Sequence, residues 1–332
     1  MTTEERAATV GGVIAPGKRR RFRPAPWFAW LVVLPLAAWT VVRLGGFETG
    51  GIGIQLMAAT PYATVAALIA TGLAVLARNR IAAVVGLAST VALAAVVLPR
   101  AFGSAQPAAS GPTLKILSIN MRFGGADATT IVNLVRTLHP DILNTQELSP
   151  WGVQHLQEAG LSELMPYDDL APERSAAGSG IFARVPLTTL PDMGLIEGHH
   201  MPHVRFTMPG GRQVELVDVH TVAPLGPDAS VWSAAMRVLP EPEAGTIRIL
   251  AGDYNATLDH AEFRRVLAKG YVDVGDAAGI GLVPTWPAGR SIPPVITIDH
   301  VLVDPRVAVV SAGVHSVPRT DHRALFAELR LP

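Results

Sequence analysis

Residues 247–255 read IRILAGDYN, and this stretch determines how the second half of the chain is interpreted. The apolar run that ends at Ala251 predicts a buried β-strand, because isoleucine and leucine pack well in a sheet. Asp253 and Asn255 follow that strand directly. Polar side chains at the end of a buried strand lie at the edge of a core, where they can meet a ligand. The same G-D-Y-N pattern could instead form no more than an Asx turn.

Other predicted strands also carry polar residues near an end. These strands cover residues 114–121, 142–147, 213–220, 295–303 and 324–329. Their polar residues are Asn120, Gln146, Glu147, His220, Asp299, Asp321 and His322. A further strand is predicted at 180–183, and helices at 129–138, 151–159, 231–239 and 260–268. Because the strands outnumber the helices and do not alternate strictly with them, we predict an α+β sandwich and not a doubly wound sheet.

Seven segments in a fixed order resemble the endonuclease/exonuclease/phosphatase superfamily over roughly residues 112–332. They read SINMRFG, PDILNTQEL, GSGIFAR, VDVHT, LAGDYNAT, TIDHVLV and RTDHRALFAEL. That family includes deoxyribonucleases, abasic-site endonucleases, inositol polyphosphate phosphatases and neutral sphingomyelinases. The resemblance implies a deoxyribonuclease-I-like fold for residues 113–332, a four-layer α/β/β/α sandwich.

The resemblance also implies a metal site and a base. Glu147 would be the leading ligand of a hard divalent cation, with Asn120 and Asp321 beside it. The cation would be Mg²⁺, with Mn²⁺ as the alternative, and it would neutralise a phosphoryl oxygen. Asp253 would orient or deprotonate the attacking water, or protonate the leaving group. Asn255 would hold Asp253 or the phosphate by hydrogen bonds.

Two histidines would contact the phosphate. His322 would do so as a cation, because Asp299 would keep its imidazole protonated near neutral pH. His220 would be a second donor. Some nucleases of the family carry a Glu or Tyr partner where this chain has Gly-Ser-Gly at 178–180, so that partner of His220 is missing. Arg184 would face either substrate or solvent.

Other histidines are also candidates for a functional role. His300 follows Asp299 and is expected on the opposite face of its strand, in a structural role. His199, His200 and His203 form H-H-x-x-H, a spacing that can bind zinc on a helix. No helical pattern surrounds them and a proline interrupts them, so a loop is predicted. Trp286 resembles a family position that packs beside the site.

The first hundred residues contain three apolar stretches, at 27–42, 52–77 and 81–98. About 20 apolar residues span a bilayer as a helix. We therefore predict three transmembrane helices within residues 27–98, a flexible linker at 99–112 and a catalytic domain at 113–332. Pro61 is expected to kink the second helix without ending it. A cleaved signal peptide or a soluble helical domain is the alternative.

Basic residues predict the orientation in the membrane. Five cations lie within residues 18–23, before the first span, and Arg78 and Arg80 separate the second span from the third. The loop between the first and second spans holds only Arg43 and Glu48 as charged residues. Because positive residues stay in the cytoplasm, residues 1–26 are predicted to be cytoplasmic and the catalytic domain extracytoplasmic.

The net charge of zero conceals two halves of opposite sign. Residues 1–110 hold 10 Lys and Arg against 3 Asp and Glu, a net charge of +7, so the rest of the chain carries −7. The domain thus lacks the positive field of a nucleic-acid binder. The absence of cysteine excludes a thiolate site.

Together these features predict a membrane-tethered phosphoesterase in which water attacks a phosphate ester directly. Its substrate would be a lipid headgroup, a small phosphodiester or nucleic acid, and no protein partner is evident. A nuclease on the extracellular side is one alternative. An inactive membrane-tethered binding module is another, and a domain with an unrelated fold is the third.

Overall fold

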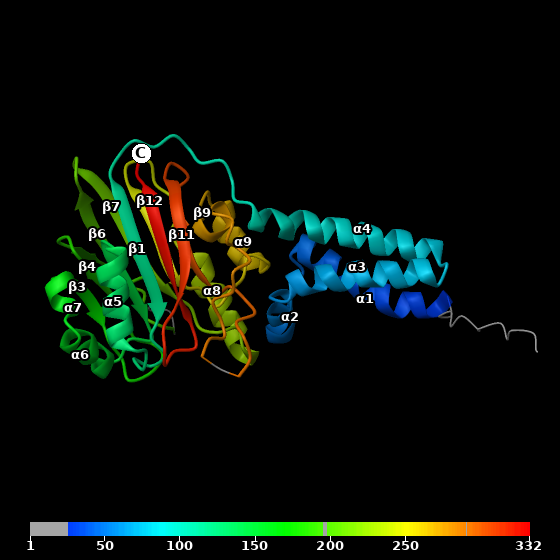
Figure 1. Ribbon diagram of the computed structural model, residues 1–332, viewed down its shortest axis with the longest axis horizontal. Coiled ribbons are helices and arrows are strands. Elements are labelled where there is room, and N and C mark those ends of the chain that lie inside the picture. Colours follow the sequence, from blue (N-terminus) through cyan, green and yellow to red (C-terminus); the bar gives the residue numbers. More distant parts are fainter. Residues whose placement is uncertain (1–25, 195–197, 290) are drawn as a thin grey trace, which may run out of the picture.

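Strands and helices separate into a two-sheet domain and a long helical segment in this computed structural model (Figure 1). We call this segment the anchor, because two of its described helices are long and apolar enough to cross a membrane. The structure describes residues 26–194, 198–289 and 291–332. The cations of residues 18–23 lie outside these ranges, so the predicted cytoplasmic N-terminus at 1–26 is not described apart from its last residue.

The described residues of the domain form two six-stranded sheets. In spatial order, the first sheet contains β11 (Ala308–Ser316), β12 (Arg323–Arg330), β1 (Thr113–Asn120), β2 (Ile142–Gln146), β4 (Ser179–Ala183) and β3 (Tyr167–Ala171). The second contains β5 (Thr188–Leu190), β6 (His203–Met208), β7 (Arg212–His220), β8 (Ile247–Asp253), β10 (Asp299–Val303) and β9 (Val272–Asp273).

Helices cover the outer faces of both sheets. The first sheet carries α5 (Ala128–Leu138), α6 (Pro150–Glu158) and α7 (Leu161–Leu164), and the second carries α8 (Ala229–Val238) and α9 (Ala261–Ala268). Two shorter elements are η2 (Gly226–Asp228) and α10 (Val274–Ala277).

Alternation along β1 illustrates how the layers form. Ile116 packs between the sheets and Leu117 packs under the helices, as a period of two requires. Both side chains are fully buried. The predicted four-layer α/β/β/α sandwich is confirmed.

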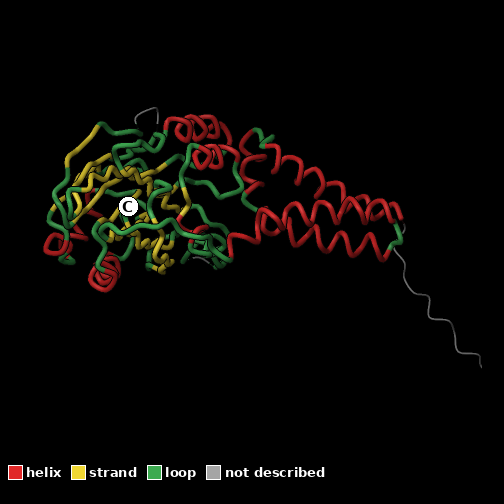
Figure 2. Tube along the Cα trace, turned by 90° about the horizontal axis from the view of Figure 1, so that it is seen from above, coloured by secondary structure: helices red, strands yellow, loops and turns green. Residues whose placement is uncertain are grey.

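The anchor consists mainly of α1 (Pro26–Gly45), α3 (Thr60–Leu76) and α4 (Arg80–Val97), which extend away from the domain as a bundle (Figures 1 and 2). Small residues let these helices approach closely. A Cβ on Gly86 of α4 would lie 2.7 Å from the Oγ1 of Thr71 on α3. Trp27–Gly45 and Arg80–Ala101 are long and apolar enough to cross a membrane.

The apolar stretch at 52–77 is not one helix, which corrects the expectation for Pro61. It forms α2 (Gly50–Met57) and α3, which meet at an angle of 74° and count as a third candidate span only if taken together. Ile54 of α2 packs into the apolar cluster of α8, so α2 lies against the domain. Pro61 lies in the first turn of α3, where a missing N–H costs no helical hydrogen bond.

Residues 99–112, predicted to be a flexible linker, are bonded to the domain. Their first three residues belong to η1 (Leu98–Ala101), and the rest follow the domain to β1 (Figure 1). The N–H groups of Ser104 and Gly111 donate to carbonyl oxygens of the domain, over 3.0 and 2.8 Å. The Oε1 of Gln106 accepts from the N–H of Val309 over 2.8 Å. The composition of the segment could not reveal these partners, because they lie far away in sequence.

Candidate active site

Strand register brings three of the expected residues into one row. His220 ends β7 and pairs with Asp253 at the end of β8, and Asp253 pairs with Asp299 at the start of β10. In the first sheet, Asn120 at the end of β1 pairs with Gln146 at the end of β2, and Glu147 follows Gln146 directly. The polar ends of the two sheets therefore meet at one edge of the sandwich.

Asn120 joins the two sheets at this edge. Its Nδ2 donates to the Oε1 of Glu147 over 3.1 Å and to the Oδ2 of Asp253 over 3.0 Å. The backbone N–H of Phe123 donates to the Oε2 of Glu147 over 3.0 Å. One buried carboxamide thus fixes the distance between a carboxylate of each sheet.

Left-handed backbone marks the same edge. Glu147 has φ +50° and Asn255 has φ +46°, values that cost energy in residues with a side chain. The N–H of Asn255 donates to the Oδ1 of Asp253 over 2.9 Å, and its Nδ2 donates to the carbonyl of Thr221 over 2.9 Å. The Asx turn that was the alternative for the G-D-Y-N pattern is therefore present, and it forms part of the candidate site.

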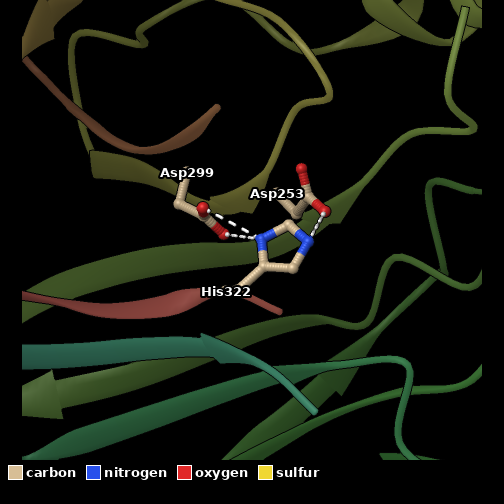
Figure 3. A group of neighbouring side chains, drawn as sticks. All are labelled: Asp253, Asp299 and His322. Atoms are coloured by element: carbon tan, nitrogen blue, oxygen red, sulfur yellow. Dashed lines mark hydrogen bonds and ion pairs between the residues drawn. The ribbon is translucent and has the colours of Figure 1, made fainter. Parts of the chain in front are cut away.

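His322 lies between two carboxylates (Figure 3). Its Nδ1 is 3.1 Å from both carboxylate oxygens of Asp299, and its Nε2 is 3.6 Å from the Oδ2 of Asp253. Burial by itself lowers the pKa of His322, but Asp299 and then Asp253 outweigh it and raise the pKa to about 10. Burial raises the pKa of Asp253 to about 7, with His322 opposing the shift and Asp299 adding to it. The group holds an imidazolium at neutral pH.

His220 has a neighbour that sequence analysis did not identify. The ring of His199 packs on the ring of His220, with centroids 4.1 Å apart and planes 38° apart. Burial lowers the pKa of His220 well below its usual value, and His199 and His322 lower it further. Burial also lowers the pKa of His199, to about 4. The Nδ1 atoms of both rings find no hydrogen-bond partner among the described residues. With both pKa values lowered, His220 in the row and His199 packed on it are neutral imidazoles at neutral pH.

The H-H-x-x-H histidines do not form one site. Whereas His199 lies against His220, the Nδ1 of His200 lies 2.9 Å from Asp192. His203 begins β6, and its Nε2 lies 3.7 Å from Glu215. The H-H-x-x-H pattern identified His199 as a candidate residue, but it could not show that His199 packs on His220.

Two expected residues lie away from the row. Arg184 follows β4 at the edge opposite the site, because Ala183 pairs with the first residue of β2. Its Nε donates to the carbonyl of Pro140 over 2.8 Å, which corrects its assignment to substrate binding. His300 is buried, and its Nδ1 is 2.8 Å from Asp273, in the structural role expected for it.

Oxygen ligands for a metal gather around Glu147. Burial raises the pKa of Glu147, and the charge of Asp321 adds to the rise, so a divalent cation near both would relieve repulsion. The two carboxylates and the Oδ1 of Asn120, which accepts from the N–H of Arg122 over 2.9 Å, are hard oxygen donors of the type that Mg²⁺ or Mn²⁺ prefers.

A second group also satisfies the distances of a metal site. Asp253, Asp299 and His322 offer ligand atoms that all lie within 4.8 Å of one another. There, however, the imidazolium already supplies the positive charge, and it would repel a cation. The group around Glu147 therefore fits a divalent cation better than this one does.

Comparisons with known proteins identify a family for the domain. The model of the Endonuclease/Exonuclease/phosphatase family matches residues 117–322. No curated protein matches the chain in sequence.

Three solved structures have a similar fold. A humanized D. rerio TDP2 is 18% identical, with a TM-score of 0.51 over 65% of this chain and 98% of that one. A conserved protein of unknown function from Enterococcus faecalis V583 is 16% identical, with a TM-score of 0.51 over 66% and 100%. Truncated Caenorhabditis elegans TDP2 is 16% identical, with a TM-score of 0.51 over 66% and 97%. At such identities the likeness concerns the fold alone. Since the family match extends over more than half of the sequence, the chain belongs to the endonuclease/exonuclease/phosphatase family.

Proposed function

We propose that this protein is a divalent-metal-dependent phosphoesterase that hydrolyses a phosphodiester or phosphomonoester by direct in-line attack of water. The observation that carries the proposal is the bridge from Asn120 to Glu147 and Asp253, next to the imidazolium of His322. Family membership supports it, because phosphoester hydrolysis is the general activity of this family.

Each residue would have a definite task. Held by Glu147, Asn120 and Asp321, Mg²⁺ or Mn²⁺ would supply charge neutralisation at a phosphoryl oxygen. Asp253 accepts a proton from the attacking water as the new P–O bond forms, and its pKa of about 7 suits that role. The bond to the leaving oxygen breaks on the opposite side of phosphorus, so no covalent enzyme intermediate arises.

The remaining polar groups stabilise charge. The cationic His322 donates a hydrogen bond to a phosphoryl oxygen and offsets the charge that develops there. Asn255 positions the loop that carries Asp253. His220 is neutral because it is buried, so it acts as a hydrogen-bond donor to the phosphate and not as a cation.

We further propose that the catalytic domain is extracytoplasmic and that α1, α3 and α4 span the membrane. Arg78 and Arg80 lie at the turn between α3 and α4, at the end of the bundle far from the domain (Figure 1). At the near end, Arg43 and Arg100 are both paired with the buried Asp259, at 2.6 and 2.7 Å. These two cations are buried and share one carboxylate, whereas Arg78 and Arg80 are exposed at the far end, as expected of its cytoplasmic side.

The catalytic proposal is tested with the full chain in lipid nanodiscs. Bis(4-nitrophenyl) phosphate and 4-nitrophenyl phosphate are supplied with Mg²⁺ or Mn²⁺, and release of 4-nitrophenolate is followed. We expect Glu147→Ala to lower kcat about 100-fold or more, because it removes a metal ligand. Glu163→Ala, on the exposed face of α7, should leave kcat unchanged.

Other outcomes separate the alternatives. If neither ester is hydrolysed by the unmodified chain with either metal, the inactive binding module replaces the enzyme. If plasmid DNA is nicked at a rate that exceeds ester turnover and Glu147→Ala abolishes the nicking, the nuclease alternative is correct.

A further inference from the structure

A cavity lies beside Asn255, on the side of the active site that faces the anchor. Its volume is about 310 Å³, within the usual range for ligand sites. One wall comes from the anchor, with Ala58 at the turn between α2 and α3, and the other from the domain, with Trp286 and Ile296. The walls are mainly apolar, although the cavity begins at a residue of the catalytic loop.

A second cavity, also of about 310 Å³, continues the first toward the bundle. Both cavities are lined by Ala58 and Ile296. The second also reaches Tyr62 and Val65 of α3, and Val65 is exposed on the surface of the bundle. The two cavities follow one another from Asn255 to α3 and share a wall, and we call them together the apolar groove.

Hydrogen bonds hold the anchor and the domain on either side of this groove. The Nε2 of Gln55 on α2 donates to the carbonyl of Pro224 over 3.2 Å. The hydroxyl of Tyr62 on α3 donates to the carbonyl of Val295 over 2.7 Å. The groove is therefore a built feature with fixed walls, and not a gap between two independent parts.

The surface around the groove is apolar at the level where α3 begins. On α2, Ile52 and Leu56 are exposed, and on the domain Leu225, Ile292 and Val295 are exposed. At the end of a membrane-spanning bundle, such side chains meet the apolar boundary of the bilayer and not water. The mouth of the groove would therefore open into lipid.

The charges of the groove do not suit a polyanion. Among the described residues that line the first cavity there is no Lys or Arg. Arg100 borders the second cavity, but its guanidinium is paired with Asp259. A nucleic acid strand leaving the site along this path would meet apolar walls and no free cation.

From these features we infer that the substrate is a membrane lipid with a phosphate-ester headgroup, and that one hydrocarbon chain of it occupies the apolar groove. The inference rests on the proposed phosphoesterase function and adds the class of substrate. The phosphate lies at Asn255 and His322 while the chain stays between α3 and Ile296. A lipid can thus present its phosphate to the site without exposing the chain to water, which would be unfavourable.

The test compares two diesters that share the reacting group and differ in the chain. Hexadecyl 4-nitrophenyl phosphate and methyl 4-nitrophenyl phosphate are supplied to the full chain in nanodiscs with Mg²⁺ or Mn²⁺. We expect kcat/KM for the hexadecyl ester to exceed that for the methyl ester. Equal values in the unmodified enzyme would overturn the inference and leave the phosphoesterase intact, whereas no hydrolysis of either ester would defeat the proposed function itself.

Filling the groove should remove this preference. In Ala58→Trp and in Ile296→Trp, the ratio of the two kcat/KM values should fall about tenfold or more, because a bulky ring occupies the space of the chain. Val310→Trp adds a ring at an exposed position on β11 and should leave the ratio unchanged. A ratio that stays constant in both groove variants would contradict the assignment.

A measurement on the unmodified chain does not depend on variants that fold. A phospholipid with a diazirine in one acyl chain is built into the nanodisc and irradiated, and the labelled peptides are identified. Labels on residues 55–65 or 282–298 that excess hexadecyl phosphate removes would support the inference. Labels confined to the outer faces of α1 and α4 would overturn it.

Discussion

His322 and Asp299 illustrate what single residues contribute at this site. They come from different sheets and meet as an imidazole and a carboxylate, with Nδ1 3.1 Å from both oxygens. The sequence placed both near the ends of predicted strands, and the family resemblance paired them. Arg184 was also near a strand end, but the wrong one. Its strand β4 runs antiparallel to β2, so the C-terminal end of β4 lies at the opposite edge.

The pairing predicts a change in the pH dependence of catalysis. Asp299 is a cause of the raised pKa of His322, about 10, so Asp299→Asn should lower that pKa. If the reaction needs the imidazolium, activity is retained up to the pKa and lost above it. The alkaline limb of kcat/KM should therefore move to lower pH in the variant.

The measurement is a pH–rate profile with methyl 4-nitrophenyl phosphate from about pH 6 to about pH 11. Asp228→Asn, at an exposed position, serves as the control and should leave the profile unchanged. An alkaline limb at the same pH in Asp299→Asn and in the unmodified enzyme would exclude this role of Asp299.

At the scale of elements, the end of α1, the short helix η1 and the loop after β8 share one buried ion pair network. The Nε of Arg43 lies 2.6 Å from the Oδ1 of Asp259. Arg100 binds the same carboxylate with two bonds, of 2.8 and 2.7 Å. Asp259 belongs to the loop that also carries Asn255. The anchor thus helps to hold the loop that carries Asn255 in place.

Removing this carboxylate should destabilise the full chain. Asp259→Asn leaves two arginines buried without a counter-charge, a loss of about 3–5 kcal/mol in the free energy of unfolding. The thermal unfolding midpoint in nanodiscs at neutral pH should fall clearly, while that of Asp228→Asn should not. An unchanged midpoint in Asp259→Asn would mean that the network contributes no net stability.

The destabilisation caused by Asp259→Asn should become smaller as the pH falls. Burial by itself raises the pKa of Asp259, but Arg100 and Arg43 outweigh it, so the pKa lies below its usual value. A lowered pKa gives stability that is present above the unfolded value of about 3.9 and is lost as the pH falls through the folded value. The difference between the midpoints of the variant and the unmodified chain should therefore shrink at acid pH.

At the scale of the whole molecule, the bundle has a domain at one end and the Arg78–Arg80 turn at the other (Figure 2). Helix α2 does not continue the bundle, because it turns by 74° and packs on the domain. The candidate active site and the apolar groove both lie on the side of the domain near the bend between α2 and α3. With the proposed spans in a bilayer, such an arrangement would keep the site next to the membrane surface.

The proposed topology predicts where each end of the chain lies. A reporter that is active only outside the cytoplasm, fused after Pro332, should be active. The same reporter fused after Arg78, at the far end of the bundle, should be silent. The reverse pattern in the two fusions would invert the orientation, and activity in both would remove α4 as a span, because α4 is the proposed span between the two fusion points.

The sequence by itself determined the apolar stretches, the strands and the chemical type of each polar residue near their ends, since these depend on neighbours along the chain. It could not show that α2 would leave the bundle, because the domain surface that Ile54 contacts lies far away in sequence. Only the tertiary structure decided that His199 lies on His220, that two anchor arginines bind Asp259 and that Arg184 faces away from the site. These contacts join distant residues, so they follow from how sheets and helices pack and not from any local pattern.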